Sequence, residues 1–329
     1  MQTNGCPLNG GQVIKPALSV ATILICSTAL IAQASGVATP LSPCDVLAYQ
    51  SLGGEGQREL LALFQNPGIA FEVTDKFVRD FTAAGSSPEI VAALRNSVHS
   101  HARASFSCEK PLYIHVLAGA SAYSARNFIR SESEWRSAVA LEPASPMLHL
   151  ALGTALGLEK KWPQAEQEHR TAVRLNPEMA LAHSRLAAAL TVLAYSGSRE
   201  QRLQQAHQEF EHAVQLSPDD CLLRANFAVT LLSQGDYAYA DKQLESAERQ
   251  CPKMTFPMYV RANSLAEQGK RKEAVAHLRS ALEIQPGNCQ ISRYLASLLS
   301  ADGDAEAQKA SAEADHLCSP DARPAQQKH

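Results

Sequence analysis

Six cysteines are the residues of this 329-residue chain whose number and placement allow covalent chemistry. No two of them form a Cys-x-x-Cys pair, which argues against a thioredoxin-like redox site and against c-type haem. An even number of cysteines in an exported chain instead predicts disulfides. The six are Cys44, Cys108, Cys221, Cys251, Cys289 and Cys318, and two more, Cys6 and Cys26, precede them.

Export is predicted by the N-terminal segment. Lys15 precedes an apolar run over residues 17–32, which is short for a membrane-spanning helix. Ala32-Gln33-Ala34 follows as a cleavage site, so we expect a signal peptide over 1–34 and a periplasmic or secreted protein beginning at Ser35. The alternative is an uncleaved segment that anchors the chain to a membrane. The residues before Cys26 and Cys44 do not fit a lipoprotein signal.

No arrangement of side chains predicts catalysis. The chain has no His-Glu-x-x-His motif, and His207 and His212 are spaced five apart, which does not suit a shared zinc ion. The glycine-rich stretch Gly53–Gly56 lacks the Lys-Ser/Thr of a phosphate-binding loop, and we interpret it as a linker. We therefore expect no enzyme activity, no catalytic residue, no metal and no cofactor.

The composition describes a folded chain with no general affinity for polyanions. The net charge is −3, which gives no reason to expect nucleic acid or an anionic membrane as the partner. Hydrophobic residues make up 45% of the chain, enough to bury a core.

A period of 34 residues organises most of the chain. It is marked by prolines at 143, 177, 218, 252, 286 and 320, with one interval of 41. Alanine stands five residues before each of the first five prolines, and a bulky side chain such as Trp135 or Phe210 stands eight before. Small residues let two helices approach, the large one fills the space between them, and the proline ends the second helix. Gly235, Gly269 and Gly303 recur at the same period and suit the turn between two helices.

This pattern resembles the tetratricopeptide repeat, most clearly at Leu152-Gly153, Trp162, Ala165, Ala172 and Pro177. The resemblance implies an all-α, right-handed α-solenoid of helix–turn–helix repeats over 111–320, with about twelve helices. The last repeat is degenerate and polar, as a capping unit requires. The third repeat has seven extra residues, which we place around Tyr195–Leu203 as a longer turn.

Residues 35–110 do not follow the repeat and are expected to form a small helical module. Thr74 and Ser87-Pro88 predict helix starts, and Ala83–Gly85 predicts a helix end. The segment 68–95 resembles a helical module found ahead of repeat arrays in some bacterial exported proteins, and a cap for the array is the alternative interpretation. Residues 321–329 are expected to be a disordered tail.

Histidines also follow the repeat. His115, His149 and His183 are 34 apart and occupy the same place in the first helix of three repeats. We interpret them as packing residues copied with the repeat, with a pH-sensitive column as the alternative.

The resemblance implies that the first helices line a concave groove that binds peptides or proteins. We predict a protein-interaction scaffold with a protein or peptide partner, or alternatively an accessory subunit that presents substrates to a separate envelope enzyme. We expect no small-molecule cofactor, and membrane contact only if the N-terminal segment is not cleaved. The predicted groove residues are Tyr113, Tyr123, Met147, Thr154, Phe256, Tyr259, Asn263 and Arg293.

The repeat register predicts how the cysteines pair. Cys221 opens the first helix of the fourth repeat and Cys251 closes its second helix, so the two lie at the same end of one antiparallel hairpin. Cys289 and Cys318 repeat this arrangement in the sixth repeat, and parity leaves Cys44 with Cys108. The alternatives are a Cys251–Cys289 pair across neighbouring repeats, or six reduced thiols if the chain is not exported.

Overall fold

The computed structural model describes residues 39–100, 102, 104, 108–196, 198–301 and 305–318. The predicted signal peptide, its cleavage site, Gly303 and the C-terminal tail lie outside the described residues. No helix of the described part is long and apolar enough to cross a membrane.

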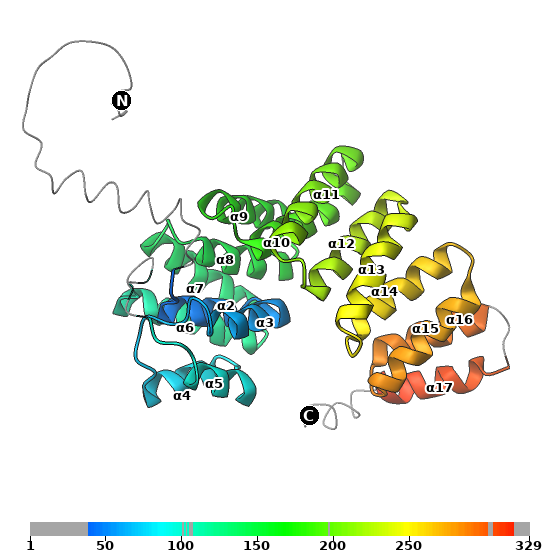
Figure 1. The fold of residues 1–329 in the computed structure, drawn as a ribbon, viewed down its shortest axis with the longest axis horizontal. Coiled ribbons are helices and arrows are strands. Elements are labelled where there is room, and N and C mark those ends of the chain that lie inside the picture. Colours follow the sequence, from blue (N-terminus) through cyan, green and yellow to red (C-terminus); the bar gives the residue numbers. More distant parts are fainter. Residues whose placement is uncertain are drawn as a thin grey trace, which may run out of the picture.

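Residues 110–318 form a row of six antiparallel helix pairs, which Figure 1 shows following one another from α6–α7 to α16–α17. The prediction of an all-α solenoid with about twelve helices is confirmed, and the described residues of this span contain no strand. The helices are α6 (Lys110–Ser124), α7 (Phe128–Leu141), α8 (Pro146–Leu158), α9 (Trp162–Leu175), α10 (Ala180–Leu193), α11 (Arg199–Leu216), α12 (Cys221–Gln234), α13 (Tyr237–Gln250), α14 (Thr255–Glu267), α15 (Arg271–Ile284), α16 (Cys289–Ala301) and α17 (Ala307–Cys318).

The described landmark prolines and glycines lie at the ends of helices, as the sequence predicts. Each second helix from α7 to α15 ends two residues before a landmark proline, because the residue before a proline is disfavoured in the helical region. Gly235 and Gly269 follow the first helices of their repeats with φ of 81° and 78°, where a side chain would be strained.

Within each pair, the residue on the first helix is matched in size to the residue that it meets on the second. Gly119 faces the Trp135 ring and Gly153 faces the His169 ring, and a Cβ at either glycine would lie 2.8 or 2.5 Å from the nearest ring atom. Later repeats carry alanine at the same position, where the partner on the second helix is Phe210, Leu244 or Leu278. The two glycines are therefore required by the larger rings.

We expect Gly119→Ala to lower the free energy of unfolding by about 1–3 kcal/mol, because the added methyl group overpacks a closed contact with Trp135. Gly54→Ala is the matched control: nothing lies within 4 Å of a Cβ built there, and alanine favours a helix by about 1 kcal/mol. Urea unfolding of both variants measures the difference. A Gly119→Ala variant as stable as the parent would contradict the packing described here.

The seven-residue insertion does not form the simple turn that the sequence predicts. A 3₁₀ turn covers Ala194–Ser196, and α11 then begins at Arg199, inside the stretch expected to be a turn. Arg199 is fixed there because its guanidinium donates to the Ser233 carbonyl at 2.8 Å. Half of the insertion therefore lengthens the second helix of the third repeat.

Within the described residues, four helices precede the array: α2 (Pro43–Gln50), α3 (Gly53–Leu63), α4 (Asp75–Ala83) and α5 (Pro88–Arg95). Thr74 and Ser87 cap α4 and α5 as predicted, and Gly85 follows α4 with φ of 92°. The interpretation of Gly53–Gly56 as a linker is wrong, because these residues form the first turn of α3. Glycine is needed at 56 because a Cβ would lie 2.3 Å from the Tyr49 carbonyl oxygen of α2.

The structure joins the six cysteines into three disulfides. Their Cα atoms are separated by 5.6 Å in Cys44–Cys108, 6.3 Å in Cys221–Cys251 and 5.1 Å in Cys289–Cys318. Cys221–Cys251 and Cys289–Cys318 are the pairs expected from the repeat register, and Cys44–Cys108 is the pair expected from parity. The last two each join the start of a first helix to the end of the second helix in the same repeat.

Candidate protein-binding groove

The concave face of the array is built from the first helix of each repeat, since neighbouring first helices such as α8, α10, α12 and α14 pack beside one another. The positions that point into this face recur every 34 residues in most repeats. Whether they are exposed depends on the N-terminal helices. The face has two halves: the N-terminal half over α6, α8 and α10, and the C-terminal half over α12, α14 and α16.

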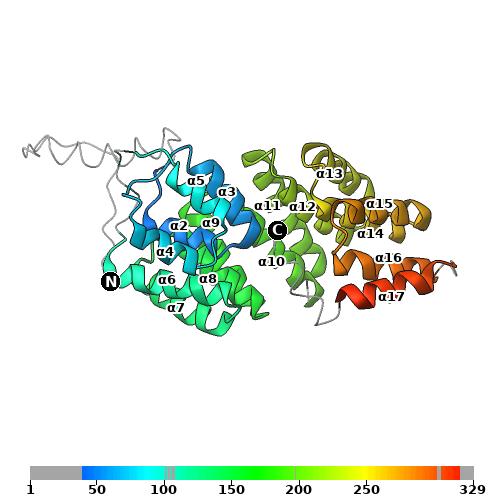
Figure 2. The same ribbon diagram turned by 90° about the horizontal axis from the view of Figure 1, so that it is seen from below.

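Helix α2 fills the N-terminal half. It packs against α6 and α8, and both ribbon views place it beside them (Figures 1 and 2). Every residue of α2 after Pro43 is buried, including Asp45 and Gln50. Val116 of α6 and Leu150 of α8 are both 0% exposed in the same core cluster as Leu47 of α2. A short apolar helix of the chain itself thus occupies the start of the groove.

Two polar contacts join the N-terminal helices to repeats further along the array. The Arg185 guanidinium of α10 donates to the Leu52 carbonyl oxygen at 2.6 Å, at the junction of α2 and α3. Arg58 of α3 lies 3.6 Å from Asp220, the residue that caps α12. The N-terminal helices therefore reach from the first repeat to the edge of the fourth, and beyond it the groove has no such cover among the described residues.

Burial raises the pKa of one carboxyl group of α2, that of Asp45. Asp45 accepts hydrogen bonds from the Ser42 amide at 2.8 Å and from the Ser42 hydroxyl at 2.7 Å. Desolvation raises the pKa of Asp45 to about 6, and the bonds from Ser42 only partly oppose it. These contacts close a capping box around the start of α2, so the carboxyl group is a structural one.

The four groove residues predicted in the N-terminal half do not form an open surface. Met147 and Thr154 are buried, with 4% and 8% exposure, and their prediction as partner contacts is corrected for that reason. Tyr113 is half-buried and its hydroxyl donates to Asp80 of α4 at 2.6 Å. Tyr123 is half-buried with its ring 6.0 Å from that of Phe128. Intramolecular packing uses the surface that these residues would present to a partner.

Of the residues predicted in the C-terminal half, one is exposed and three are partly covered by their own array. Phe256, Tyr259 and Asn263 of α14 are half-buried, and Arg293 of α16 is exposed. Val229 of α12, which stands 34 residues before Asn263, is 39% exposed and extends the same strip. The structure therefore brings together four of the eight predicted residues on two neighbouring helices.

Tyr294 completes this group and was not predicted from the sequence. Its ring centroid lies 5.5 Å from that of Tyr259, and its hydroxyl donates to the Asn263 side-chain oxygen at 3.2 Å. Burial raises the pKa of Tyr294, and Tyr259 and Glu267 add to the effect, so the hydroxyl stays protonated and donates. Tyr294 stands one residue after Arg293, which occupies the position of Tyr259 in the next repeat, and this place in the sequence could have identified it.

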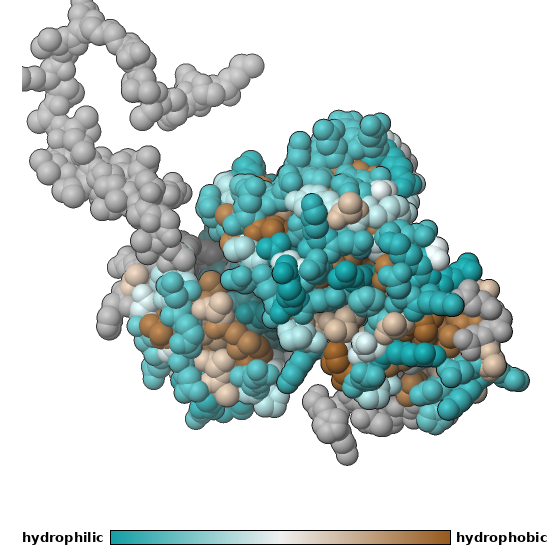
Figure 3. All heavy atoms as spheres, turned by 45° about the vertical axis from the view of Figure 1, so that its right-hand side comes forward, coloured by the Kyte–Doolittle hydropathy of each residue, from teal (hydrophilic) through white to brown (hydrophobic). Residues whose placement is uncertain are grey.

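Apolar side chains reach the surface in separate patches on the face shown in Figure 3, which is otherwise hydrophilic. The strip of Val229, Phe256, Tyr259 and Tyr294 lies with the Asn263 amide and the exposed Arg293 guanidinium on α12, α14 and α16. Aromatic and arginine side chains of this kind supply much of the energy of protein interfaces. The strip offers apolar contact and hydrogen bonds, and it contains no arrangement suited to bond-making chemistry.

The histidine column lies beside the groove and joins each repeat to the loop before it. His149 Nδ1 lies 2.6 Å from a Glu168 carboxylate oxygen, and its Nε2 lies 3.0 Å from the Pro143 carbonyl oxygen. His183 makes the same two contacts, at 2.6 Å to Glu209 and 2.8 Å to Pro177. Both ring nitrogens face acceptors, and only the imidazolium has two N–H groups to donate.

These contacts predict the direction of the pH dependence. Burial alone would lower the pKa of His149 and of His183, but the hydrogen bonds to carboxylate and carbonyl outweigh burial and raise both. A histidine whose folded-state pKa is raised stabilises the fold fully below its ordinary pKa, and this stabilisation is lost as the pH rises through the folded value.

We expect the free energy of unfolding to fall as the pH rises from about 6.5 to 8. In a His149→Gln, His183→Gln variant this slope should disappear, and stability at pH 6 should fall by roughly 1.5–3 kcal/mol. His115→Gln is the control, because His115 contacts only Glu134 and is more exposed. Urea unfolding across this pH range measures both effects, and equal slopes for parent and double variant would contradict the account.

No group of three or more His, Cys, Asp or Glu side chains is placed to hold a metal ion within the part of the chain that the structure describes. His183 does meet His212, with ring centroids 4.4 Å apart. His183 already contacts Glu209 and Pro177 through its two nitrogens.

Comparison with known proteins supports the fold. No family model matches the sequence, and no curated protein matches it. Among solved structures, TTC0263, a thermophilic tetratricopeptide-repeat protein of Thermus thermophilus, aligns over 59% of this chain and 99% of its own, with 20% identity and a TM-score of 0.52. The Cut9–Hcn1 hetero-tetramer of the APC/C aligns over 63% of this chain and 40% of its own, with 13% identity and a TM-score of 0.54.

These likenesses, together with the repeat landmarks and the twelve helices, show that the chain has the tetratricopeptide-repeat fold. At 20% and 13% identity, these similarities show the fold alone. The residues of this chain are the basis for the partner, the compartment and the binding surface proposed below.

Proposed function

We propose that this chain is an exported protein-interaction scaffold that binds a peptide segment or a protein partner on the C-terminal half of its concave face. The observation that carries the proposal is the contrast between the two halves. The N-terminal half is filled by α2, whereas on α14 and α16 Arg293 is exposed and Phe256, Tyr259 and Asn263 are half-buried.

Three disulfides support the exported location, because such bonds persist in oxidising compartments and are rare in reducing ones. They lie at the N-terminal helices, in the fourth repeat and in the last repeat. Cleavage after Ala34 remains the expected route, and an uncleaved anchor is the alternative.

The binding surface is tested by Tyr259→Ala combined with Asn263→Ala. We expect at least tenfold weaker binding, about 1.4 kcal/mol or more, because the change removes an aromatic contact and an amide one helical turn apart. The partner is first captured from envelope extract with residues 35–329 and identified by mass spectrometry, and its affinity is then measured by calorimetry.

Tyr195→Ala is the matched control, because Tyr195 is 67% exposed and lies outside α14 and α16. It should bind the captured partner like the parent chain. If the double variant keeps full affinity while remaining folded by circular dichroism, the partner binds elsewhere and the assignment of the C-terminal half is wrong.

A further inference from the structure

The N-terminal end of the array keeps a stacking surface with no repeat in front of it. Positions of α8 that pack on the preceding helix pair are fully buried, as at Leu148 and Ala151, with 0% and 1% exposure. The same positions of α6, 34 residues earlier, are Ile114 and Leu117. Ile114 is 53% exposed and Leu117 is half-buried. An end repeat that only faced water would be polar here.

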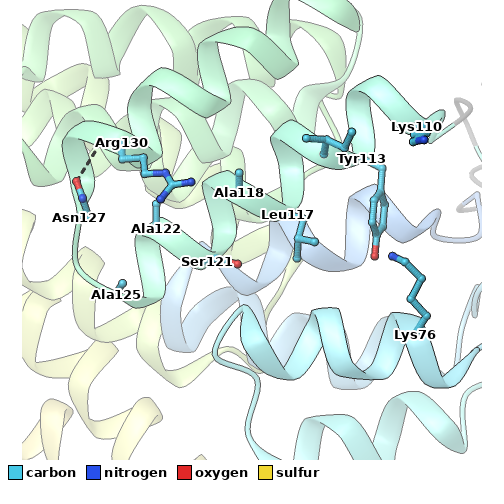
Figure 4. Close-up of a pocket in the computed structure, with 11 residues that line it drawn as sticks. Lys76, Lys110, Tyr113, Leu117, Ala118, Ser121, Ala122, Ala125, Asn127 and Arg130 are labelled. Carbon is cyan, nitrogen blue, oxygen red and sulfur yellow. Dashed lines mark hydrogen bonds between the residues drawn. The ribbon is translucent and has the colours of Figure 1, made fainter.

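This surface forms one side of a pocket of 710 Å³ between α6, the start of α7 and Lys76 of α4 (Figure 4). Leu117, Ala118 and Ala122 give it an apolar lining. The end of the array thus carries exposed apolar side chains around a concave site rather than a polar cap.

The charged residues that line the pocket are all cations. Lys76, Lys110 and Arg130 line it, and no carboxylate does. Lys76 pairs with Asp80 at 2.6 Å, and Arg130 lies 3.9 Å from Glu134, but both acids are outside the pocket. Lys110 makes no ion pair within the described residues. The lining therefore combines apolar side chains with one cation that has no acidic partner among the described residues and two cations that share their charge with acids outside the pocket.

We propose that this end face, defined by Ile114, Leu117, Lys76, Lys110 and Arg130, binds an acidic amphipathic helix of a partner protein. The helical form follows from the repeat, because a helix pair covers the equivalent positions of α8. The acidic flanks follow from Lys110, which makes no ion pair within the described residues, and from Lys76 and Arg130, whose paired acids lie outside the pocket. This site is separate from the C-terminal half of the groove and does not depend on the function proposed for it.

Two synthetic helical peptides test the proposal with the full chain. Both carry leucines at i, i+3, i+4 and i+7, and the flanking positions are glutamate in one and lysine in the other. In fluorescence anisotropy we expect the glutamate peptide to bind at least tenfold more tightly than the lysine peptide. Its binding should weaken as salt is raised. Equal binding of the two peptides, or no binding of either, would overturn the proposal.

Variants locate the site. Ile114→Glu, and separately Lys110→Glu with Arg130→Glu, should each weaken binding of the glutamate peptide at least tenfold. Ile284→Glu is the matched control, because Ile284 is 40% exposed at the far end of α15, and it should bind like the parent. Tyr259→Ala should also leave this peptide unaffected.

Two other outcomes would replace the proposed occupant. Concentration-dependent dimers in analytical ultracentrifugation that Ile114→Glu abolishes would assign the face to a second copy of the chain. Co-sedimentation with phosphatidylglycerol vesicles that Ile114→Glu abolishes, without peptide binding, would assign it to a membrane surface. Either result overturns the acidic helix.

Discussion

Replacing Cys44 and Cys108 by alanine is expected to lower the free energy of unfolding by about 4 kcal/mol, because the disulfide closes a loop of 64 residues. The same change should loosen α2, which this bond ties to the start of α6. Hydrogen exchange should then rise in residues 43–50 before it rises in the later repeats.

The control is the parent chain treated with a reducing agent that leaves no other covalent change. It should lose stability to at least the same extent, since it also loses the two hairpin disulfides. An alanine variant that keeps full stability and unchanged protection in α2 would show that packing alone holds α2 in the groove.

Removing either one of the hairpin disulfides is expected to have the second largest effect. Cys221–Cys251 and Cys289–Cys318 close loops of 30 and 29 residues, and each should contribute roughly 3–4 kcal/mol. The sixth repeat should suffer more than the fourth from the loss of its bond, because a terminal repeat packs against one neighbour only. Cys289→Ala with Cys318→Ala should therefore unfold α16 and α17 ahead of the rest.

Non-reducing peptide mapping of the exported protein tests the pairs themselves. We expect linked peptides containing Cys221 with Cys251 and Cys289 with Cys318. Recovery of a Cys251–Cys289 peptide, or of free Cys221 or Cys318, would contradict the hairpin pairs. Equal hydrogen exchange in the fourth and sixth repeats after removal of both bonds would contradict the argument from the terminal position.

The repeat could be predicted because its landmarks act locally. A proline that follows a helix keeps it from continuing, and a glycine accepts the turn after it, so Pro252 and Gly269 predicted both the helix boundaries and the register of the cysteines. The caps of α4 and α5 were predictable for the same reason. Nothing in these positions depends on contacts between distant segments.

The filled half of the groove could not be predicted, because it depends on where distant helices meet. The sequence places Met147 and Thr154 on the concave side of α8, but their burial follows from the packing of the concave face, where α2 also lies against α8. The linker prediction for Gly53–Gly56 was wrong for a related reason: these residues begin α3, and Gly56 allows the close approach of α3 to α2. The length of α11 likewise depends on Arg199 meeting Ser233 of the next repeat.

The two halves of the concave face should differ in what they contact, one being occupied by the chain itself and one open to a partner. Photo-crosslinking tests this difference most directly, with p-benzoylphenylalanine placed at Tyr259 in one variant and at Met147 in another. We predict that the probe at 259 links the chain to its captured partner and that the probe at 147 links α8 to residues 43–50 of the same chain. A partner crosslink from 147, with none from 259, would contradict the division of the face into a filled and an open half.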